Sequence, residues 1–246
     1  MITIDNLTIR LGGRPILEDA SVAIPLGARV GLIGRNGAGK STLMKALIGE
    51  LEPDNGTIEM PRRARVGYVA QEAPSGPTTP FEAVLAGDAE RAQLLEEAET
   101  CTNMERLGDV HERLLAIDAY AAPSRAAIIL TGLGFDEAMQ AQPLDTFSGG
   151  WKMRVALGAL LLSNPEILLL DEPSEGLAPI IVQAIGELIR KLRAMGVTIV
   201  LAEQNMHFCL GISEDAAIID NGHIVYRSTI QELRGNTEVT HRYLAI

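Results

Sequence analysis

The residues best suited to chemistry lie first in a short glycine-rich run between an apolar stretch, Ala28 to Ile33, and a helical pattern, Leu43 to Ile48. Its glycines let the backbone turn tightly and aim N–H groups inward, so the run and the helix N-terminus after it form a cradle for anionic oxygens. Lys40 would reach the β- and γ-phosphates, and Ser41 would offer a hydroxyl to a bridging Mg²⁺, with Thr42 as the weaker candidate. The sequence therefore predicts a phosphate-binding loop, made of Gly34, Arg35, Asn36, Gly37, Ala38, Gly39, Lys40, Ser41 and Thr42. The alternative interpretation is a glycine-rich turn without a ligand.

A second candidate is a pair of carboxylates, Asp171 and Glu172, at the end of the apolar run Ile167 to Leu170. Asp171 would bind Mg²⁺ directly or through a water, and Glu172 would orient and deprotonate the water that attacks the γ-phosphate. The alternative is a capping pair in front of Pro173.

A third candidate is the motif Ser148-Gly149-Gly150, which precedes an apolar helix predicted from Met153 to Leu162. Two glycines in an opening helical turn cost about 1 kcal/mol each relative to alanine. An anion bound to bare backbone N–H groups would explain them, and so would an ordinary helix capped by Ser148.

The elements that must position these residues alternate between apolar strands and helical patterns, which predicts an α/β protein with a mainly parallel core sheet. The run Ile2 to Leu11, followed by Gly12-Gly13, predicts an edge strand or hairpin at the start. From Phe81 to Ala141 the composition shifts to Ala, Leu and Glu with helical periodicity, which predicts an inserted helical subdomain with an acidic, solvated face. The later elements are predicted as a helix from Pro179 to Met195, a strand from Val197 to Ala202, a hairpin around Asn221-Gly222 and a final helix from Ile230 to Arg234.

Composition limits the function classes. The 246 residues allow one large domain or two small ones, and a formal net charge of −11 argues against broad attraction to nucleic acid or anionic lipid. The longest apolar runs are far shorter than the ~20 residues of a membrane span, and the N-terminus lacks the pattern of a secretory signal, so we expect a cytoplasmic protein. Cys101 and Cys209 lack metal-type spacing and are expected to be reduced, buried thiols.

Taken in order, the phosphate loop, Gln71, Ser148-Gly149-Gly150, Asp171-Glu172 and the polar Gln204 after the last core strand resemble the ATP-binding cassette (ABC) family. The resemblance implies a P-loop NTPase fold with an N-terminal antiparallel β subdomain and an inserted α-helical subdomain. It implies that residues 1–246 form a single nucleotide-binding domain, with the helical subdomain at 81–160. The cofactors would be ATP and Mg²⁺, and the activity would be ATP hydrolysis.

By the same resemblance, two cassettes would close head to tail as a homo- or heterodimer, so that Ser148-Gly149-Gly150 of one covers the nucleotide on the phosphate loop of the other. Ser148 and Gly150 would then touch the γ-phosphate. Gln71 would sense Mg²⁺ or the attacking water, and Gln204 would complete the catalytic set with Glu172.

The resemblance divides along the chain. Residues 1 to 157 look like the ABC-F group, which are soluble cassette proteins that act on ribosomes. Residues from 163 onward, including 171–179 and 203–206, look like the ATPase subunit of branched-chain amino-acid importers. We therefore hypothesise a hybrid chain, and favour an importer subunit that dimerises beneath two membrane permease subunits at the inner face of the plasma membrane. The alternatives are a ribosome-associated ABC-F factor and an ATP-binding domain without a native partner.

Three positions depart from the family pattern. Leu11 stands where an aromatic residue usually stacks on adenine, so only apolar contact with the base is expected. Trp151 replaces the usual glutamine after Ser-Gly-Gly, as it often does in the ABC-F group. Gln204 replaces the switch histidine, and since an amide makes weaker bonds to phosphate than a charged donor, we expect slow turnover that Gln204→His would raise. His207 is expected on the surface or in packing, turned away from the position of Gln204.

Overall fold

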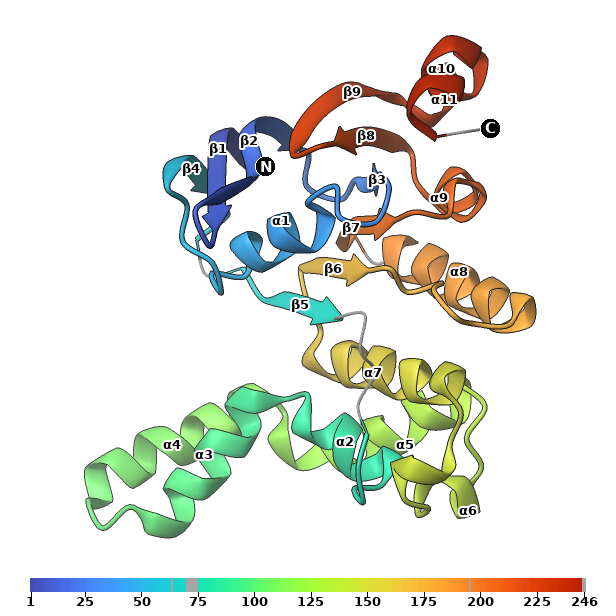
Figure 1. The fold of residues 1–246 in the computed structure, drawn as a ribbon. Helices are drawn as coiled ribbons and strands as arrows, with labels where there is room; N and C mark the ends of the chain where they lie inside the picture. Colours follow the sequence, from blue (N-terminus) through green and yellow to red (C-terminus); the bar gives the residue numbers. More distant parts are fainter. Residues whose placement is uncertain (63, 70–74, 195, 245–246) are drawn as a thin grey trace. The chain divides into compact units, whose positions relative to one another are not determined.

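The computed structural model describes residues 1–62, 64–69, 75–194 and 196–244 (Figure 1). The chain divides into two compact units, and each is described by itself. The first unit contains Met1–Gln71 and Pro165–Ile246, and the second contains Glu72–Asn164.

The larger sheet of the first unit has six strands in the order β5-β6-β7-β3-β8-β9. These strands are β3 (Arg29–Ile33), β5 (Val66–Val69), β6 (Ile167–Asp171), β7 (Thr198–Glu203), β8 (Asp215–Asp220) and β9 (His223–Thr229). All neighbours pair in parallel except β8 and β9, which form the hairpin expected around Asn221-Gly222. The predicted mainly parallel core sheet is confirmed. Parallel pairing also brings the carboxyl ends of β3, β6 and β7 to one edge of the sheet.

The smaller sheet is antiparallel, with the order β2-β1-β4. It consists of β1 (Ile2–Leu11), β2 (Arg14–Ile24) and β4 (Asn55–Glu59). Gly12 and Gly13, both at positive φ, make the turn between β1 and β2, so the expected N-terminal hairpin is present. This sheet is the antiparallel β subdomain that the family resemblance implied.

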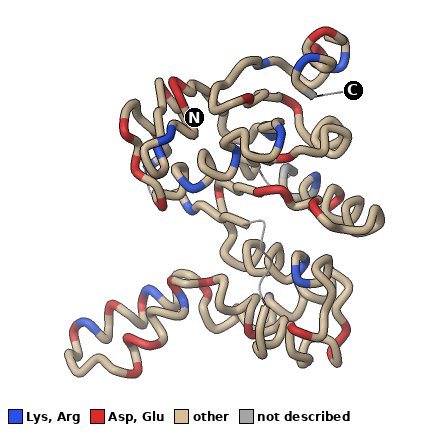
Figure 2. The backbone as a smooth tube through the Cα atoms, viewed as in Figure 1, with Lys and Arg blue, Asp and Glu red and all other residues tan. Residues whose placement is uncertain are grey.

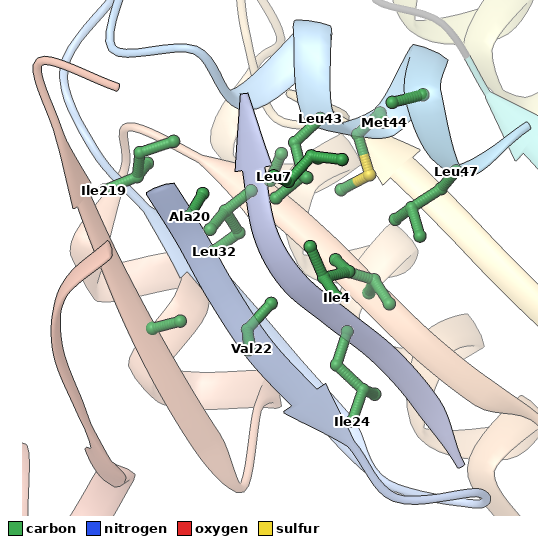
Figure 3. Packing of buried hydrophobic residues seen from close by; sticks show 14 of the residues in the cluster. Ile4, Leu7, Ala20, Val22, Ile24, Leu32, Leu43, Met44, Leu47 and Ile219 are labelled. Carbon is green, nitrogen blue, oxygen red and sulfur yellow. The ribbon is translucent and has the colours of Figure 1, made fainter. Parts of the chain in front are cut away.

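Helix α1 (Lys40–Leu47) packs against the core of the first unit, where it follows the glycine-rich loop. Figure 3 shows Leu43, Met44 and Leu47 of this helix gathered with Ile4 and Leu7 of β1. Each of these side chains is at most 5% exposed, so α1 is held rigidly at its apolar face. The remaining helices of this unit are α8 (Pro179–Ala194), α9 (Met206–Ile212), α10 (Ile230–Gly235) and α11 (Thr237–Leu244). Helix α11 was not predicted.

The described residues of the second unit contain helices and no strand. The helices are α2 (Pro80–Ala86), α3 (Ala89–Thr100), α4 (Met104–Ala116), α5 (Ala122–Gly132), α6 (Glu137–Gln140) and α7 (Gly149–Ser163). Helix α7 begins earlier than the predicted Met153. Its main core includes Val84, Leu130 and Phe135, and a smaller core beneath α3 and α4 includes Val110 and Leu114. The fold thus carries the predicted helical insert.

Helix α3 has no buried residue, as expected for a solvated acidic face. Its carboxylates face basic residues of α4 in two exposed ion pairs, Glu97 with Arg106 and Glu90 with Arg113, each 2.6 Å long. Figure 2 shows both signs of charge along this helical pair. Solvent and salt screen exposed pairs of this kind, so they order the helical pair only weakly.

Among the described residues, no single helix has the length and apolar composition to cross a membrane. One bent pair, Met104–Ala116 with Ala119–Gly132, meets the length and composition criteria together, with an angle of 56° between its halves. Of the two free cysteines, Cys209 is buried as expected, whereas Cys101 is partly exposed because it lies just beyond the end of α3.

Candidate functional site

The glycine-rich loop joins the carboxyl end of β3 to the N-terminus of α1. Gly37 and Gly39 have φ values of 79° and 108°, in the left-handed region that favours glycine. A Cβ at Gly34 would collide with the carbonyl oxygen of Ile219, and one at Gly39 would lie 2.8 Å from Leu17 Cδ2. The conformation of the loop therefore requires glycine at positions 34 and 39 for space, and at 39 for backbone geometry as well.

The N-terminus of α1 has no side-chain cap and no acidic residue in its first turn. The first-turn N–H groups of a helix have no intrahelical partners, and the helix dipole adds positive potential at the same end. Together with the left-handed glycines before it, this end of α1 is a site suited to an anion.

The Lys40 side chain lies inside the loop and is only 2% exposed. Its Nζ donates hydrogen bonds to the carbonyl oxygens of Gly34, at 2.7 Å, and Arg35, at 2.9 Å. It also forms an ion pair with Glu172 Oε1 at 2.9 Å. The loop and the second carboxylate of the acidic pair are therefore in direct contact.

Asp171, the first carboxylate of the pair, contacts the same loop from the end of β6. Ser41 Oγ donates to Asp171 Oδ1 at 3.1 Å, and the Tyr68 hydroxyl donates to Asp171 Oδ2 at 3.3 Å. Burial raises the pKa of the Asp171 carboxyl above its ordinary range, while these two hydrogen bonds act in the opposite direction. Burial and then the charge of Asp171 raise the pKa of the Tyr68 phenol, so Tyr68 remains a donor.

Glu172 adopts a left-handed backbone conformation, with φ at 50°. This conformation is uncommon for a residue other than glycine and costs of order 1–3 kcal/mol. Its N–H donates to the carbonyl oxygen of Ala202 in β7 at 2.9 Å, which holds the turn in place. The strained turn follows the end of β6, and it lies at the residue that forms the ion pair with Lys40.

Glu203, at the end of β7, is a buried carboxylate that the sequence analysis did not assign. It is 2% exposed, its Oε1 accepts from the Ser174 N–H at 2.9 Å, and its Oε2 accepts from the Asn205 N–H at 3.3 Å. A pocket of about 260 Å³ beside it is lined by Glu172, Ser174, Glu175, Glu203, Gln204 and Asn205. One signal could have drawn attention to Glu203: it is a charged residue that ends an otherwise uncharged buried strand. Tyr68 had no comparable signal.

The other predicted site residues are placed as follows. Leu11 ends β1 and is 45% exposed, so its side chain is accessible. Gln204 is exposed beside the pocket and His207 is exposed in α9. Gln71 lies outside the described residues.

Ser148-Gly149-Gly150 opens α7 in the second unit. Ser148 occupies the N-cap position, but its side chain makes no capping hydrogen bond. Trp151, in the first turn, packs edge-on against Phe135 with ring centroids 4.8 Å apart, and the Arg154 guanidinium lies 4.6 Å from its ring centroid. The first turn of α7 is therefore anchored by Trp151 and leaves its N–H groups without a side-chain cap.

The fold and the loop with its neighbouring acidic pair define the class, a P-loop ATPase. The family model described as "ABC transporter" matches residues 17–175, so the chain belongs to the ABC transporter family and is an ATP-binding ATPase domain of that family.

Curated relatives of the chain carry ABC-F names or a more general one. Probable ATP-binding protein YheS of Escherichia coli (strain K12) is 41% identical over 180 residues, covering 72% of this chain and 28% of that protein. ABC transporter F family member 4 of Dictyostelium discoideum is 36% identical over 252 residues, covering 96% of this chain and 21% of that protein. ATP-binding cassette sub-family F member 2 of Mus musculus is 37% identical over 229 residues, covering 92% and 35%. The chain therefore spans about a fifth to a third of the length of these relatives.

Solved structures share the fold. A nucleotide-free ATP-binding cassette from an ABC transporter matches with a TM-score of 0.77 and 21% identity, covering 100% of this chain and 98% of that one. A dimeric cassette in a post-hydrolysis state with ADP and Pi matches with a TM-score of 0.72 and 22% identity, covering 94% and 99%. The P-loop NTPase fold that the resemblance implied is confirmed.

These comparisons correct part of the sequence interpretation. The Dictyostelium and mouse F-family relatives match 96% and 92% of the chain, so their matches extend well into the segment that resembles an importer subunit. They favour the ABC-F alternative over the importer subunit and give no support to amino-acid transport or to a hybrid chain.

Proposed function

We propose that this chain binds and hydrolyses Mg²⁺-ATP as a cassette of the ABC-F type, in partnership with a second cassette. The observation that supports it best is the convergence of Lys40 and Ser41 from the loop with Asp171 and Glu172 from the end of β6. The loop belongs to residues 34–42 and the carboxylates to a distant part of the chain, so only the fold brings them together.

The backbone amides of residues 34–42 and the Lys40 side chain would bind the phosphates of ATP. The left-handed glycines and the uncapped α1 N-terminus favour the triphosphate, and Lys40 already lies within the loop. The phosphates would compete with Glu172 for the ammonium group, because both are anionic partners of one buried cation. Exposed Leu11 offers apolar contact to the base.

The residues present also suit Mg²⁺. The Ser41 hydroxyl and an Asp171 carboxylate oxygen are 3.1 Å apart, and both are hard oxygen donors of the kind that Mg²⁺ prefers. No group of three or more His, Cys, Asp or Glu within the described parts of the chain could hold a metal ion alone. The cation would take its other ligands from phosphate and water oxygens and from Gln71.

Glu172 is the proposed general base, and Gln204 the proposed γ-phosphate contact. Both line the pocket at the ends of β6 and β7, which has room for water. Release of Glu172 from Lys40 upon nucleotide binding would leave its carboxylate available to orient and deprotonate the attacking water.

A second cassette would supply Ser148, Gly149 and Gly150 to this nucleotide. The N-terminus of α7 supports this role, since the Ser148 side chain makes no capping hydrogen bond to its N–H groups. We also propose that residues 1–246 act as one nucleotide-binding domain, with residues 81–160 as its helical subdomain.

The catalytic assignment is tested with two variants and one control. Lys40→Ala should weaken ATP binding itself, whereas Glu172→Gln should retain ATP and lose nearly all hydrolysis, a fall of at least about 100-fold. Glu59→Gln, on the exposed face of β4, makes the same change of charge away from the site and should behave as the unmodified protein. Full activity of the Glu172→Gln variant would remove Glu172 as the base.

The ABC-F assignment is tested by the partner that the ATP-bound state holds. We expect Glu172→Gln, loaded with Mg²⁺-ATP, to co-sediment with ribosomes, and Lys40→Ala to remain in the supernatant. Co-purification with membrane permease subunits instead would restore the importer interpretation.

A further inference from the structure

We propose that Glu203 is a positioning residue, whose carboxylate ties the loop after β6 to the loop after β7 and so sets the distance between Glu172 and Gln204. The inference rests on the proposed function, because those two residues are the proposed base and γ-phosphate contact.

The two oxygens of the carboxylate serve different loops. Oε1 accepts from the N–H of Ser174, two residues after Glu172, at 2.9 Å. Oε2 accepts from the N–H of Asn205, the residue after Gln204, at 3.3 Å. The carbonyl oxygen of Glu203 also accepts from the N–H of Gly34, the first residue of the phosphate loop, at 3.2 Å. One residue therefore contacts three segments of the site.

The surroundings of Glu203 indicate that packing alone does not explain why a carboxylate occupies this position. The side chain is 2% exposed, and burial raises the pKa of its carboxyl group, which the hydrogen bonds from Ser174 and Asn205 partly offset. Burying a charged group is unfavourable unless it is fully hydrogen-bonded, and an apolar residue would fill this position at lower cost. A carboxylate has the property that an apolar residue lacks, which is two acceptor oxygens directed at two separate N–H groups.

Glutamine at this position would keep the shape of the side chain but would lose one of its two acceptor oxygens. It has a single acceptor oxygen, and its NH₂ group would face either the Ser174 N–H or the Asn205 N–H as a second donor. One of the two N–H groups would then lose its acceptor. The Ser174 hydroxyl also bonds to the carboxylate, so the loop after β6 has a second contact and the loop after β7 depends more on the single acceptor oxygen. Because catalytic groups must be held within fractions of an ångström, the loss should reduce turnover more than nucleotide binding, which depends on the phosphate loop.

The direct test is amide hydrogen exchange on nucleotide-free protein. In Glu203→Gln we expect the amide of Ser174 or of Asn205 to exchange at least tenfold faster than in the unmodified protein, with other amides of β6 and β7 unchanged. Glu59→Gln is the matched control and should change neither amide. Unchanged exchange at both amides in a folded Glu203→Gln variant would overturn the proposal.

The functional test compares kcat, KM and ATP affinity. We expect kcat of Glu203→Gln to fall between about tenfold and a hundredfold, with KM and ATP affinity within twofold of the unmodified protein. An unchanged kcat would overturn the proposal, and so would equal losses in ATP affinity and kcat, since these indicate a general structural defect. If the unmodified protein does not hydrolyse ATP, the proposed function fails, while the exchange experiment still decides whether Glu203 ties the loops.

A second variant covers the case in which Glu203→Gln does not fold. Glu203→Asp keeps both acceptor oxygens on a shorter side chain, so it should retain an activity between those of the glutamine variant and the unmodified protein. Where only the aspartate variant folds, faster exchange at Ser174 and Asn205 together with a lower kcat supports the proposal. Unchanged values of both overturn it.

Discussion

The buried ion pair between Lys40 and Glu172 is present in the structure and is expected to separate when ATP binds. Their side chains are 2% and 7% exposed, and removal of one partner from a buried pair typically costs about 3–5 kcal/mol because the other charge is left without compensation. Lys40 avoids much of this cost, since it also donates to two loop carbonyls. The pair can therefore separate when phosphate oxygens arrive, without leaving the lysine unsatisfied.

The two cysteines should differ in reactivity. Cys209 is fully buried, and burial raises the pKa of its thiol, whereas Cys101 is partly exposed. Since the thiolate is the reactive form, a disulfide reagent such as DTNB should label one thiol in the native protein and two in denaturant. Cys101→Ser is the control and should abolish the native signal. Rapid native labelling of two thiols would contradict the burial of Cys209.

Glu203 should make stability depend on pH in a defined direction. Burial raises the pKa of its carboxyl in the folded protein above the ordinary value of 4.5, and the charge of Glu172 adds to the rise. Its contribution to stability is therefore fully present below the ordinary pKa and is lost as pH rises through the folded pKa. We expect the unfolding free energy of the unmodified protein, relative to Glu203→Gln, to fall as pH is raised from 4.5. Urea denaturation at a series of pH values measures this difference, and a constant or rising difference would contradict it.

At the scale of the elements, the contact between α2 and α7 depends on a glycine whose backbone is ordinary. A Cβ at Gly87 would lie 2.6 Å from the carbonyl oxygen of Ala159. Gly87→Ala should destabilise the protein by about 1–3 kcal/mol, because the two helices must move apart. Denaturant unfolding followed by circular dichroism measures the change.

A matched control lies in the same unit. Gly108 is exposed in α4, and nothing lies within 4 Å of a Cβ placed there. Gly108→Ala should therefore stabilise the protein by about 1 kcal/mol through helix propensity. If both substitutions changed the free energy of unfolding equally, the close approach of α2 and α7 would not determine the effect at Gly87.

At the scale of the whole molecule, the proposed pairing of two cassettes must overcome like charge. Each copy carries a formal net charge of −11, so association should be weak at low salt. We expect Glu172→Gln with Mg²⁺-ATP to form a dimer whose fraction rises as salt is increased toward about 0.1 M, where the screening length falls to about 10 Å.

Size-exclusion chromatography with light scattering measures the mass. Lys40→Ala under the same conditions should stay monomeric because it lacks bound nucleotide. A dimer of the same abundance without ATP would contradict nucleotide-driven closure.

The amino-acid sequence by itself determined the chemistry of individual segments. The loop of residues 34–42, the carboxylates at 171 and 172 and the Ser148-Gly149-Gly150 motif are local patterns, and each follows from neighbouring residue types and from strand or helix periodicity. The mainly parallel sheet and the helical insert followed from the same periodicity. Helix α11 did not, because it is only 8 residues long and mostly polar.

Only the tertiary structure decided which distant residues meet. Tyr68 reaches Asp171 because β5 lies beside β6, and Glu203 joins the loops at Ser174 and Asn205 and the first residue of the phosphate loop because β7 lies between β6 and β3. Strand order depends on how the whole apolar core packs, and no local period in the sequence encodes it. The same physical reason explains why the sequence predicted the carboxylates at 171 and 172 but assigned no role to the buried one at 203.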